Sequence, residues 1–335
     1  GLMENQGLEI RGFQDGQYNV TFDGIPWYDS NTFTHHTTSY FMTHDLNQAS
    51  VDRGPGTAST IGDATFGGTV SLTSKDPLDQ LTLTPYTSFG SFNTQLYGAE
   101  FDTGAIDKLG GATAFLDGER LTSDGYLTNA GQTRDNFFGK FIRPIGDNTV
   151  LTVVAMYNQI HQYVPLGATM AQIQQNGPNF GLSSDPTRQD YFGYNQDYIT
   201  SDFEYVGVKS NLGDGWTVDN KAYTDAYYHH GNNGLDLSGL TANGTKLSAA
   251  DVPGAVMKND YRSFGDVLRF TKDLPFGDVQ TGIWYDHQTN SRDQYEVDWS
   301  QGGAYNPINK YPAGSPLAGQ STALDRLMHD SLDTV

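Results

Sequence analysis

The sequence predicts a mainly β protein in which a small mixed α/β unit precedes an antiparallel, up-and-down sheet. From Leu81 onward, strand-length runs of alternating apolar and polar residues follow one another, and a period of two is that of a β-strand. The connections between these runs alternate between short and long. The first 76 residues lack this regularity and read as short strands joined by polar loops. We therefore expect two domains, residues 1–76 and residues 77–335.

The lengths of the connections between strands indicate the class of β protein to which the second domain belongs. Those at 104–108, 144–148, 213–215 and 274–278 are short, whereas those at about 121–132, 164–197, 230–259 and 291–322 are long. Tight turns at one end and long loops at the other are typical of transmembrane β-barrels. The expected strands are 81–90, 93–103, 109–120, 133–143, 149–162, 198–211, 216–229, 260–273 and 279–290, with another beginning near 323.

Strand 216–229 shows the two faces that such a barrel needs. Trp216, Val218 and Ala222 alternate with the polar or charged residues Lys221 and Asp225. Successive side chains leave a strand on opposite faces. In a barrel we expect the apolar face to meet lipid and the polar face to line the interior.

Composition excludes several other classes. The chain has 335 residues, no cysteine and a formal net charge of −20. Without cysteine there is no disulfide framework and no thiolate metal site. The acidic balance argues against nucleic acid as a partner, because phosphates attract lysine and arginine. No apolar run approaches the ~20 residues of a membrane-spanning helix. We find no catalytic motif and do not predict an enzyme.

The first domain should contain a few local elements. Residues 10–13, residues 19–22 and a segment at Val51 read as strands. A turn is expected at Asp23-Gly24 or at Gly24-Ile25-Pro26, and a single helical turn at residues 45–49. In the second domain, residues 172–175 should form a short helix over the barrel mouth.

One stretch carries a family signature. An arginine precedes a sharp corner in the segment Val51-Asp52-Arg53-Gly54-Pro55-Gly56. Another strand begins in the segment Phe66-Gly67-Gly68-Thr69-Val70. Glu9-Ile10-Arg11-Gly12-Phe13 and Val20-Thr21-Phe22-Asp23-Gly24-Ile25-Pro26 precede them in order. Together these pieces resemble the plug domain of TonB-dependent outer-membrane receptors, with Gly12, Gly54, Gly67 and Gly68 as motif glycines.

The resemblance implies a fold and a function. Members of this family have a 22-stranded barrel in the outer membrane of Gram-negative bacteria, filled by an N-terminal plug. Such a receptor imports a scarce ligand with energy from the TonB complex of the inner membrane. A ferric siderophore or another metal chelate is the ligand that we expect first, and no cofactor is expected. Plug arginines, here Arg11 and Arg53, would pair with glutamates of the barrel wall and lock the plug in place.

The same resemblance suggests that the chain is a fragment. Gly1 enters directly into plug-like sequence, so we expect the TonB box to lie before it. The strand runs are about half of those that the family barrel needs. Three alternatives stay open: an oligosaccharide-specific receptor of the same family, a passive porin, and a soluble glycan-binding β-domain.

The candidate ligand site is the long loop at residues 27–41. It gathers aromatic, imidazole and carboxylate groups, and a plug loop of this length can reach the extracellular apex. Such groups suit stacking and hydrogen bonding to an organic ligand, and they also suit iron or copper. Adjacent histidines on an extended chain point in opposite directions, so we predict no metal site. A purely structural loop is the remaining alternative. The candidate residues are Trp27, Tyr28, Asp29, Asn31, His35 and His36.

Overall fold

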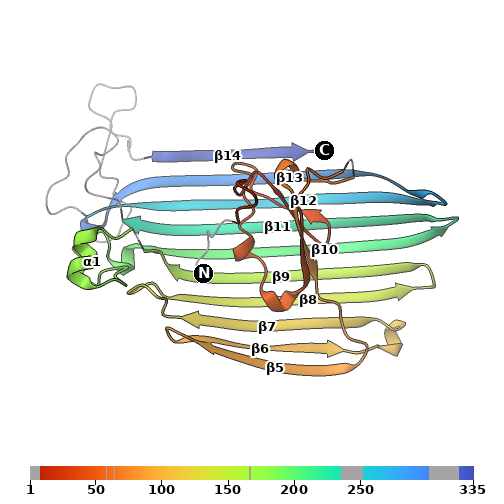
Figure 1. Cartoon of the computed structure of the whole chain (residues 1–335), viewed down its shortest axis with the longest axis horizontal. Helices are drawn as coiled ribbons and strands as arrows, with labels where there is room; N and C mark the ends of the chain where they lie inside the picture. Colours follow the sequence, from red (N-terminus) through yellow and green to blue (C-terminus); the bar gives the residue numbers. More distant parts are fainter. Residues whose placement is uncertain (1–7, 58, 64, 166, 235–251, 302–323) are drawn as a thin grey trace, which may run out of the picture.

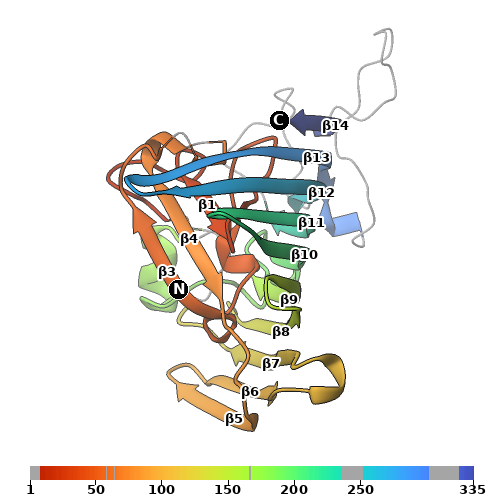
Figure 2. The same ribbon diagram turned by 90° about the vertical axis from the view of Figure 1, so that its right-hand side faces the viewer.

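The computed structural model describes residues 8–234, 252–301 and 324–335, except residues 58, 64 and 166. It contains a sheet of four strands and a sheet of ten strands. The small sheet and its loops, described here from residue 8 to residue 76, are called the N-terminal unit, and the ten-stranded sheet is called the wall. The wall is curved, and the N-terminal unit lies in its trough (Figure 2).

The wall is an antiparallel meander. Each strand pairs with the next one in sequence, and β5 and β14 form its two edges (Figure 1). This confirms the predicted mainly β fold with an up-and-down sheet after residue 80. The strands are β5 (Leu81–Gly90), β6 (Thr94–Thr103), β7 (Thr113–Ser123), β8 (Gln132–Ile145), β9 (Thr149–Tyr163), β10 (Gln196–Gly213), β11 (Trp216–Gly234), β12 (Pro253–Leu274), β13 (Gly277–Asp298) and β14 (Leu324–Thr334).

Connection lengths differ between the two ends of the wall. At one end, strands are joined through 146–148, 214–215 and 275–276, and through the longer 104–112. At the other end lies the loop 164–195 with helix α1 (Met170–Asn176), which contains the predicted helix 172–175 (Figure 1). The first connection at this end, 91–93, is short. The predicted loops 230–259 and 291–322 were too long, because β11 runs to Gly234, β12 begins at Pro253 and β13 runs to Asp298. The rest of these loops falls largely on residues 235–251 and 302–323, outside the described residues.

Helix α1 begins at a complete capping box. The amide of Gln172 donates to the Thr169 hydroxyl, and the Gln172 side chain accepts from the Thr169 amide. These two bonds satisfy donors that the first turn of a helix leaves free. No helix in the described part of the chain is long and apolar enough to cross a membrane.

The small sheet has the order β2-β1-β4-β3, with β1 parallel to β4 and the other pairs antiparallel. Asp23 and Gly24, both with positive φ, form the turn between β1 and β2. Of the two turns expected here, the first is therefore right. The strands are β1 (Asn19–Phe22), β2 (Ile25–Pro26), β3 (Leu46–Asp52) and β4 (Thr69–Ser74).

Two local predictions were wrong. Residues 10–13 form a tight turn, with Arg11 and Gly12 at positive φ and Ile10 bridged to Phe13, instead of a strand. The predicted helical turn at residues 45–49 is a 3₁₀ turn at Thr43–Asp45, and strand β3 begins at Leu46. Pairing with β4 outweighs the weak local helical tendency, because each ladder position gains hydrogen bonds with the partner strand.

The wall presents two different faces. On β10, Ile199, Phe203 and Tyr205 are buried toward the N-terminal unit, whereas the alternate residues Tyr198 and Val206 are about half exposed. Further exposed apolar residues occur on other strands, including Leu116, Phe137, Phe264 and Ile283. A large apolar outer surface is unfavourable in water and favourable against lipid. This agrees with the outer-face assignment of the sequence analysis.

The N-terminal unit and the wall share one hydrophobic core. The Phe22 ring stacks on Phe41 with centroids 3.9 Å apart, and the edge of the Phe203 ring meets Phe22 at 5.3 Å. The indole of Trp27 meets the same group, 5.4 Å from Phe41. Because Phe203 belongs to the wall, the N-terminal unit cannot leave the trough without exposing these rings to water.

The motif glycines Gly67 and Gly68 lie where the backbone leaves no space. A Cβ atom on Gly67 would come within 2.3 Å of the Gln17 carbonyl oxygen. A Cβ atom on Gly68 would come within 2.4 Å of the Asp52 carbonyl oxygen, and Gly68 has φ +116°. The Gly-Gly pair therefore lets β4 enter between β1 and β3. Gly12 has open space around it, and the nearest atom to a Cβ on Gly54 is 3.4 Å away.

We predict that Gly68→Ala destabilises the N-terminal unit by roughly 2 kcal/mol or more, because both the φ angle and the contact oppose a side chain. Gly54→Ala is the matched control and should change stability little. Urea-dependent protease sensitivity of the N-terminal unit measures both effects. Equal sensitivity of the two variants would contradict this reading of the motif.

Candidate functional site

The loop at residues 27–41 lies at the end of the N-terminal unit that faces the long loops of the wall. Four of the six candidate residues are buried, namely Trp27, Tyr28, Asp29 and His35, each at most 4% exposed. Asn31 and His36 are partly exposed. The candidate residues thus fall into a buried layer and a partly accessible one.

The accessible part of the loop is a turn over residues 29–34. The Asp29 amide donates to the Thr34 carbonyl at 2.8 Å, and the Phe33 amide donates to the Asp29 carbonyl at 2.6 Å. Phe33 has φ +57° and is 44% exposed, and Thr32 beside it is exposed. Phe33 was not among the predicted site residues, although an aromatic side chain at such a tip offers a stacking surface. The only sequence signal for Phe33 was its position among the aromatic residues of the loop 27–41.

The side chains of His35 and His36 contact different neighbours. The Nδ1 atom of His35 lies 2.6 Å from the Asp15 carboxylate. The ring of His36 stacks on Tyr227 of the wall at 4.2 Å, and its Nε2 atom lies 3.9 Å from Asp29. Among the described residues, no group of three or more histidine and acidic side chains could hold a metal ion.

The two carboxylates beside these histidines stay acidic. Burial disfavours the charged form of Asp15, but the hydrogen bond and charge of His35 more than offset this and hold the pKa of Asp15 below its usual value. Burial acts in the same way on Asp29. There His36, the Asn31 amide and Arg292 hold the pKa of the carboxyl below its usual value.

Three consecutive carbonyl groups join the loop to the wall. They belong to Thr38, Ser39 and Tyr40, at the 3₁₀ turn Thr37–Ser39 and just after it. Side chains of three neighbouring strands donate to them at 2.5 Å each: Arg134 of β8 to Thr38, Ser201 of β10 to Ser39, and Asn158 of β9 to Tyr40. Wall side chains thus replace the missing strand partners of this segment.

The predicted lock arginines make no such contacts in the described part of the chain. Both Arg11 and Arg53 are exposed, and Arg11 donates to the Arg53 carbonyl at 3.1 Å. Neither pairs with a carboxylate of the described residues. Their role as a lock stays a prediction.

Other basic side chains of the N-terminal unit do reach wall carboxylates. The Nδ1 atom of His44 lies 3.0 Å from Glu119, and its ring stacks on Tyr86 at 4.0 Å. The Nζ atom of Lys75 lies 2.6 Å from Glu100. Neither pair could be predicted from the sequence, because the acidic partners are distant in sequence and the wall carboxylates cannot be told apart until the strand register is known.

Asp45 is a buried acid beside these pairs. It is 0% exposed, and one carboxylate oxygen accepts from the Met42 amide at 2.8 Å. The other oxygen has no hydrogen-bond partner among the described residues. Burial, with the nearby charges of Asp117 and Glu119, raises the pKa of Asp45 to about 7, although Arg134 acts against this.

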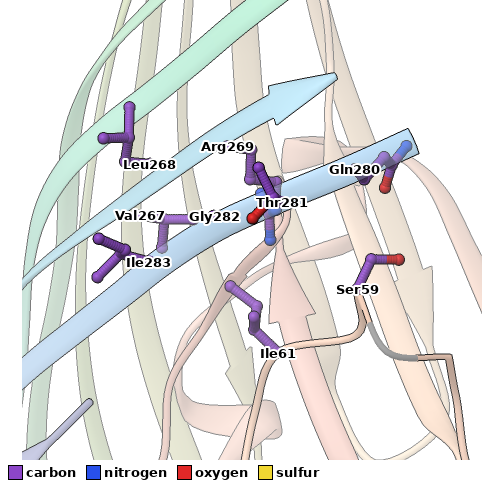
Figure 3. A pocket seen from close by; sticks show the side chains of 9 residues that line it. All are labelled: Ser59, Ile61, Val267, Leu268, Arg269, Gln280, Thr281, Gly282 and Ile283. Atoms are coloured by element: carbon purple, nitrogen blue, oxygen red, sulfur yellow. The ribbon is translucent and has the colours of Figure 1, made fainter. Parts of the chain in front are cut away.

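A crevice separates the N-terminal unit from β12 and β13 nearer the short-turn end. It has a volume of about 180 Å³. Figure 3 shows Ser59 and Ile61 on one side and Arg269, Gln280 and Gly282 on the other. Its lining is mixed, with four aliphatic residues beside the polar groups of Ser59, Thr281, Arg269 and Gln280. This side of the N-terminal unit is packed less densely than the shared core.

We predict that Asp45→Asn stabilises the N-terminal unit increasingly as pH rises. A folded-state pKa of about 7 against an ordinary 3.8 means that the contribution of Asp45 to stability is full below 3.8 and is lost as pH rises through 7. Asparagine carries no charge and keeps an acceptor for Met42. The stability gap between variant and wild type should be smallest near about pH 4 and should reach roughly 1–4 kcal/mol above about pH 7.

Thermal unfolding of both proteins across this range measures the gap. Asp52→Asn, an exposed acid of the same unit, is the control and should give a gap that does not widen in this way. A gap for Asp45→Asn that is independent of pH would contradict the prediction.

Comparison with known proteins shows which family model and which solved structures this chain resembles. Residues 1–69 match the family model of the TonB-dependent receptor plug domain. A search of curated protein sequences gives no match. Among solved structures, the unliganded ferric citrate transporter superposes with a TM-score of 0.67 at 13% identity, over 87% of this chain and 42% of that chain.

Two other structures show the same fold. The ferripyoverdine receptor of the outer membrane of Pseudomonas aeruginosa, bound to ferripyoverdine, superposes with a TM-score of 0.63 at 13% identity, over 98% of this chain and 44% of that chain. A siderophore receptor from Acinetobacter baumannii gives a TM-score of 0.60 at 16% identity, over 87% of this chain and 40% of that chain. The chain therefore spans less than half the length of these three structures.

The family model and the structures describe receptors and transporters, not enzymes. They support the predicted location in the outer membrane of a Gram-negative bacterium. Residues 1–69 thus match the plug domain of TonB-dependent receptors, and the sheet that follows has the fold seen in outer-membrane receptors that carry such a plug.

Proposed function

We propose that this receptor imports a scarce ligand across the outer membrane with energy supplied by the TonB complex. A ferric siderophore or a similar metal chelate is the ligand class that we favour. In this proposal residues 1–76 form the C-terminal part of the plug domain, and residues 77–335 form the first part of a barrel in contact with outer-membrane lipid.

One observation carries the proposal. The N-terminal unit is seated in the trough of the wall by a shared core and by polar contacts, with the loop 27–41 facing the long-loop end. A plug held in this way obstructs free diffusion, which a passive porin requires. The exposed outer face of the wall, with Phe264 and Ile283, suits lipid and does not suit a soluble glycan-binding domain.

We propose the turn 29–34 and its surroundings as the floor of the ligand vestibule. Asn31, Phe33 and His36 are the partly exposed or exposed groups that a descending ligand would meet. Trp27, Tyr28, Asp29 and His35 would act from beneath by shaping this floor. Aromatic rings and a few polar groups are a common combination in small-molecule sites.

The ligand class is inferred from similarity of fold. The relatives named above are a ferric citrate transporter, a ferripyoverdine receptor and a siderophore receptor. At 13–16% identity the likeness to these proteins is one of architecture.

We predict that a deletion strain loses growth on a ferric chelate as the only iron source, with ferric citrate and ferripyoverdine among the chelates tested. Restoring the receptor should restore growth in a strain with TonB and should not do so in a strain without it. Growth on free ferrous iron, which can pass porins, is the control. Lost growth on an oligosaccharide in place of a chelate would overturn the ligand class, and TonB-independent uptake would overturn the mechanism.

A further inference from the structure

We propose that Asn259 of β12, together with Gln288 and Asn290 of β13, forms a latch that positions the turn 29–34 for ligand contact without itself touching the ligand. The proposal rests on the function proposed above. It assigns a role in ligand recognition to wall residues that lie beneath the floor of the vestibule.

Gln288 holds the backbone on both sides of Asp29. Its amide nitrogen donates to the Tyr28 carbonyl at 2.7 Å, and its amide oxygen accepts from the Ser30 amide at 2.7 Å. The same nitrogen donates to the Ser263 hydroxyl at 2.8 Å, which fixes the orientation of the amide. Gln288 is fully buried. One side chain thus supplies the two hydrogen bonds that a neighbouring strand would otherwise provide.

The Asp29 carboxylate makes the second contact of the latch. Asn290 donates to one oxygen at 3.0 Å, and Asn259 donates to the other at 3.3 Å. The Asn31 amide donates to the first oxygen at 2.9 Å. The carboxylate is completely buried, so each of these donors replaces a water molecule that ionised Asp29 would have in solution.

Asn259 and Asn290 both act as hydrogen-bond donors to Asp29 through their side-chain amide groups. Within the described residues, the side-chain oxygens of Asn259 and Asn290 have no hydrogen-bond partner, while both amide nitrogens point at Asp29. This arrangement is favourable when Asp29 carries a charge, because hydrogen bonds to an ionised acceptor are the strong ones. The Nη1 atom of Arg292 and the Nε2 atom of His36 each lie 3.9 Å from a carboxylate oxygen of Asp29.

The turn needs such support because its backbone is strained. Phe33 has a positive φ of +57°, and His36, just after the turn, has a φ of +47°; non-glycine residues enter this region at a cost. The latch holds the turn from the wall side, while Thr32 and Phe33 are exposed on the other. Without the latch, these two residues would no longer be fixed relative to a ligand.

The rest of the plug is anchored independently of the latch. The carbonyls of Thr38, Ser39 and Tyr40 are held by β8–β10, and Tyr205 donates to the Asp23 carboxylate at 2.8 Å. Breaking the latch should therefore loosen the turn and leave the plug in the wall. This separates a positioning role from a general structural one.

A reciprocal exchange tests the latch. Asp29→Asn places two amide groups against each other at Asn259, and Asn259→Asp places two carboxylates together. The double variant restores one amide-to-carboxylate bond in the opposite direction, and the contacts of Asn290 and the Asn31 amide can persist. Gln280→Glu, on the exposed lower part of β13, controls for an added inner-face charge.

Amide hydrogen exchange of the full receptor is the first readout. We expect each single variant to speed exchange over residues 28–34 at least tenfold, the double variant to return it to within about threefold of wild type, and β4 to be unchanged in all. Unchanged exchange in the single variants, or a double variant no better than either, would overturn the proposal. Faster exchange in β4 as well would also overturn it, because the residues would then be general plug anchors.

Uptake of radioactive iron supplied as ferric citrate or as ferripyoverdine is the second readout. The single variants should raise the apparent KM at least fivefold with little change in the maximal rate, and the double variant should restore it. A lower maximal rate at unchanged KM would contradict positioning. If the wild-type receptor imports neither chelate, that choice of ligand fails, whereas hydrogen exchange still decides whether the latch exists.

Discussion

The structure depends on satisfying the backbone of a buried loop that has no strand partner. Fifteen residues, 27–41, follow β2 and include the 3₁₀ turn Thr37–Ser39, and much of this segment lies inside the protein. Buried carbonyl and amide groups without partners are costly. Here the partners are side chains of the wall: Arg134, Asn158 and Ser201 for the carbonyls at 38–40, and Gln288 for residues 28 and 30. The polar inner face of the wall is therefore complementary to this plug.

A second set of contacts involves acidic side chains of the inner face. Carboxylates and amides on the inner face meet specific groups of the plug, as Glu100 meets Lys75 and Glu119 meets His44. Asp45 is the exception, an acid placed near other acids, and its raised pKa follows from that position. Each hydrogen bond of this kind contributes about 0.5–1.5 kcal/mol net, and these bonds add to the shared hydrophobic core that holds the N-terminal unit in the wall.

Much of the fold could be predicted from the sequence. Period-two alternation located every wall strand, since the pattern is local and the turns at 146–148, 214–215 and 275–276 carry glycine, asparagine or proline signals. The errors lay where pairing partners decide the structure. Residues 46–49 become a strand because β4 lies beside them, and residues 10–13 form a turn although their pattern suits a strand.

The candidate site was predicted less completely. The loop was found by its length and composition, but the burial of Tyr28 and Asp29 results from Gln288 and Asn290, more than 250 residues further along the chain. No sequence pattern encodes that contact. Phe33 was missed because its exposure depends on a positive φ angle that its residue type does not suggest.

The central claim is that the wall spans the outer membrane with α1 outside the cell and the turn 275–276 facing the periplasm. Because the chain has no cysteine, single cysteines at the exposed positions Met170 and Phe276 give a direct test. A membrane-impermeant maleimide should label Met170→Cys on intact cells, and it should label Phe276→Cys only after the outer membrane is permeabilised. Labelling of both positions on intact cells, or the reverse pattern, would contradict the account.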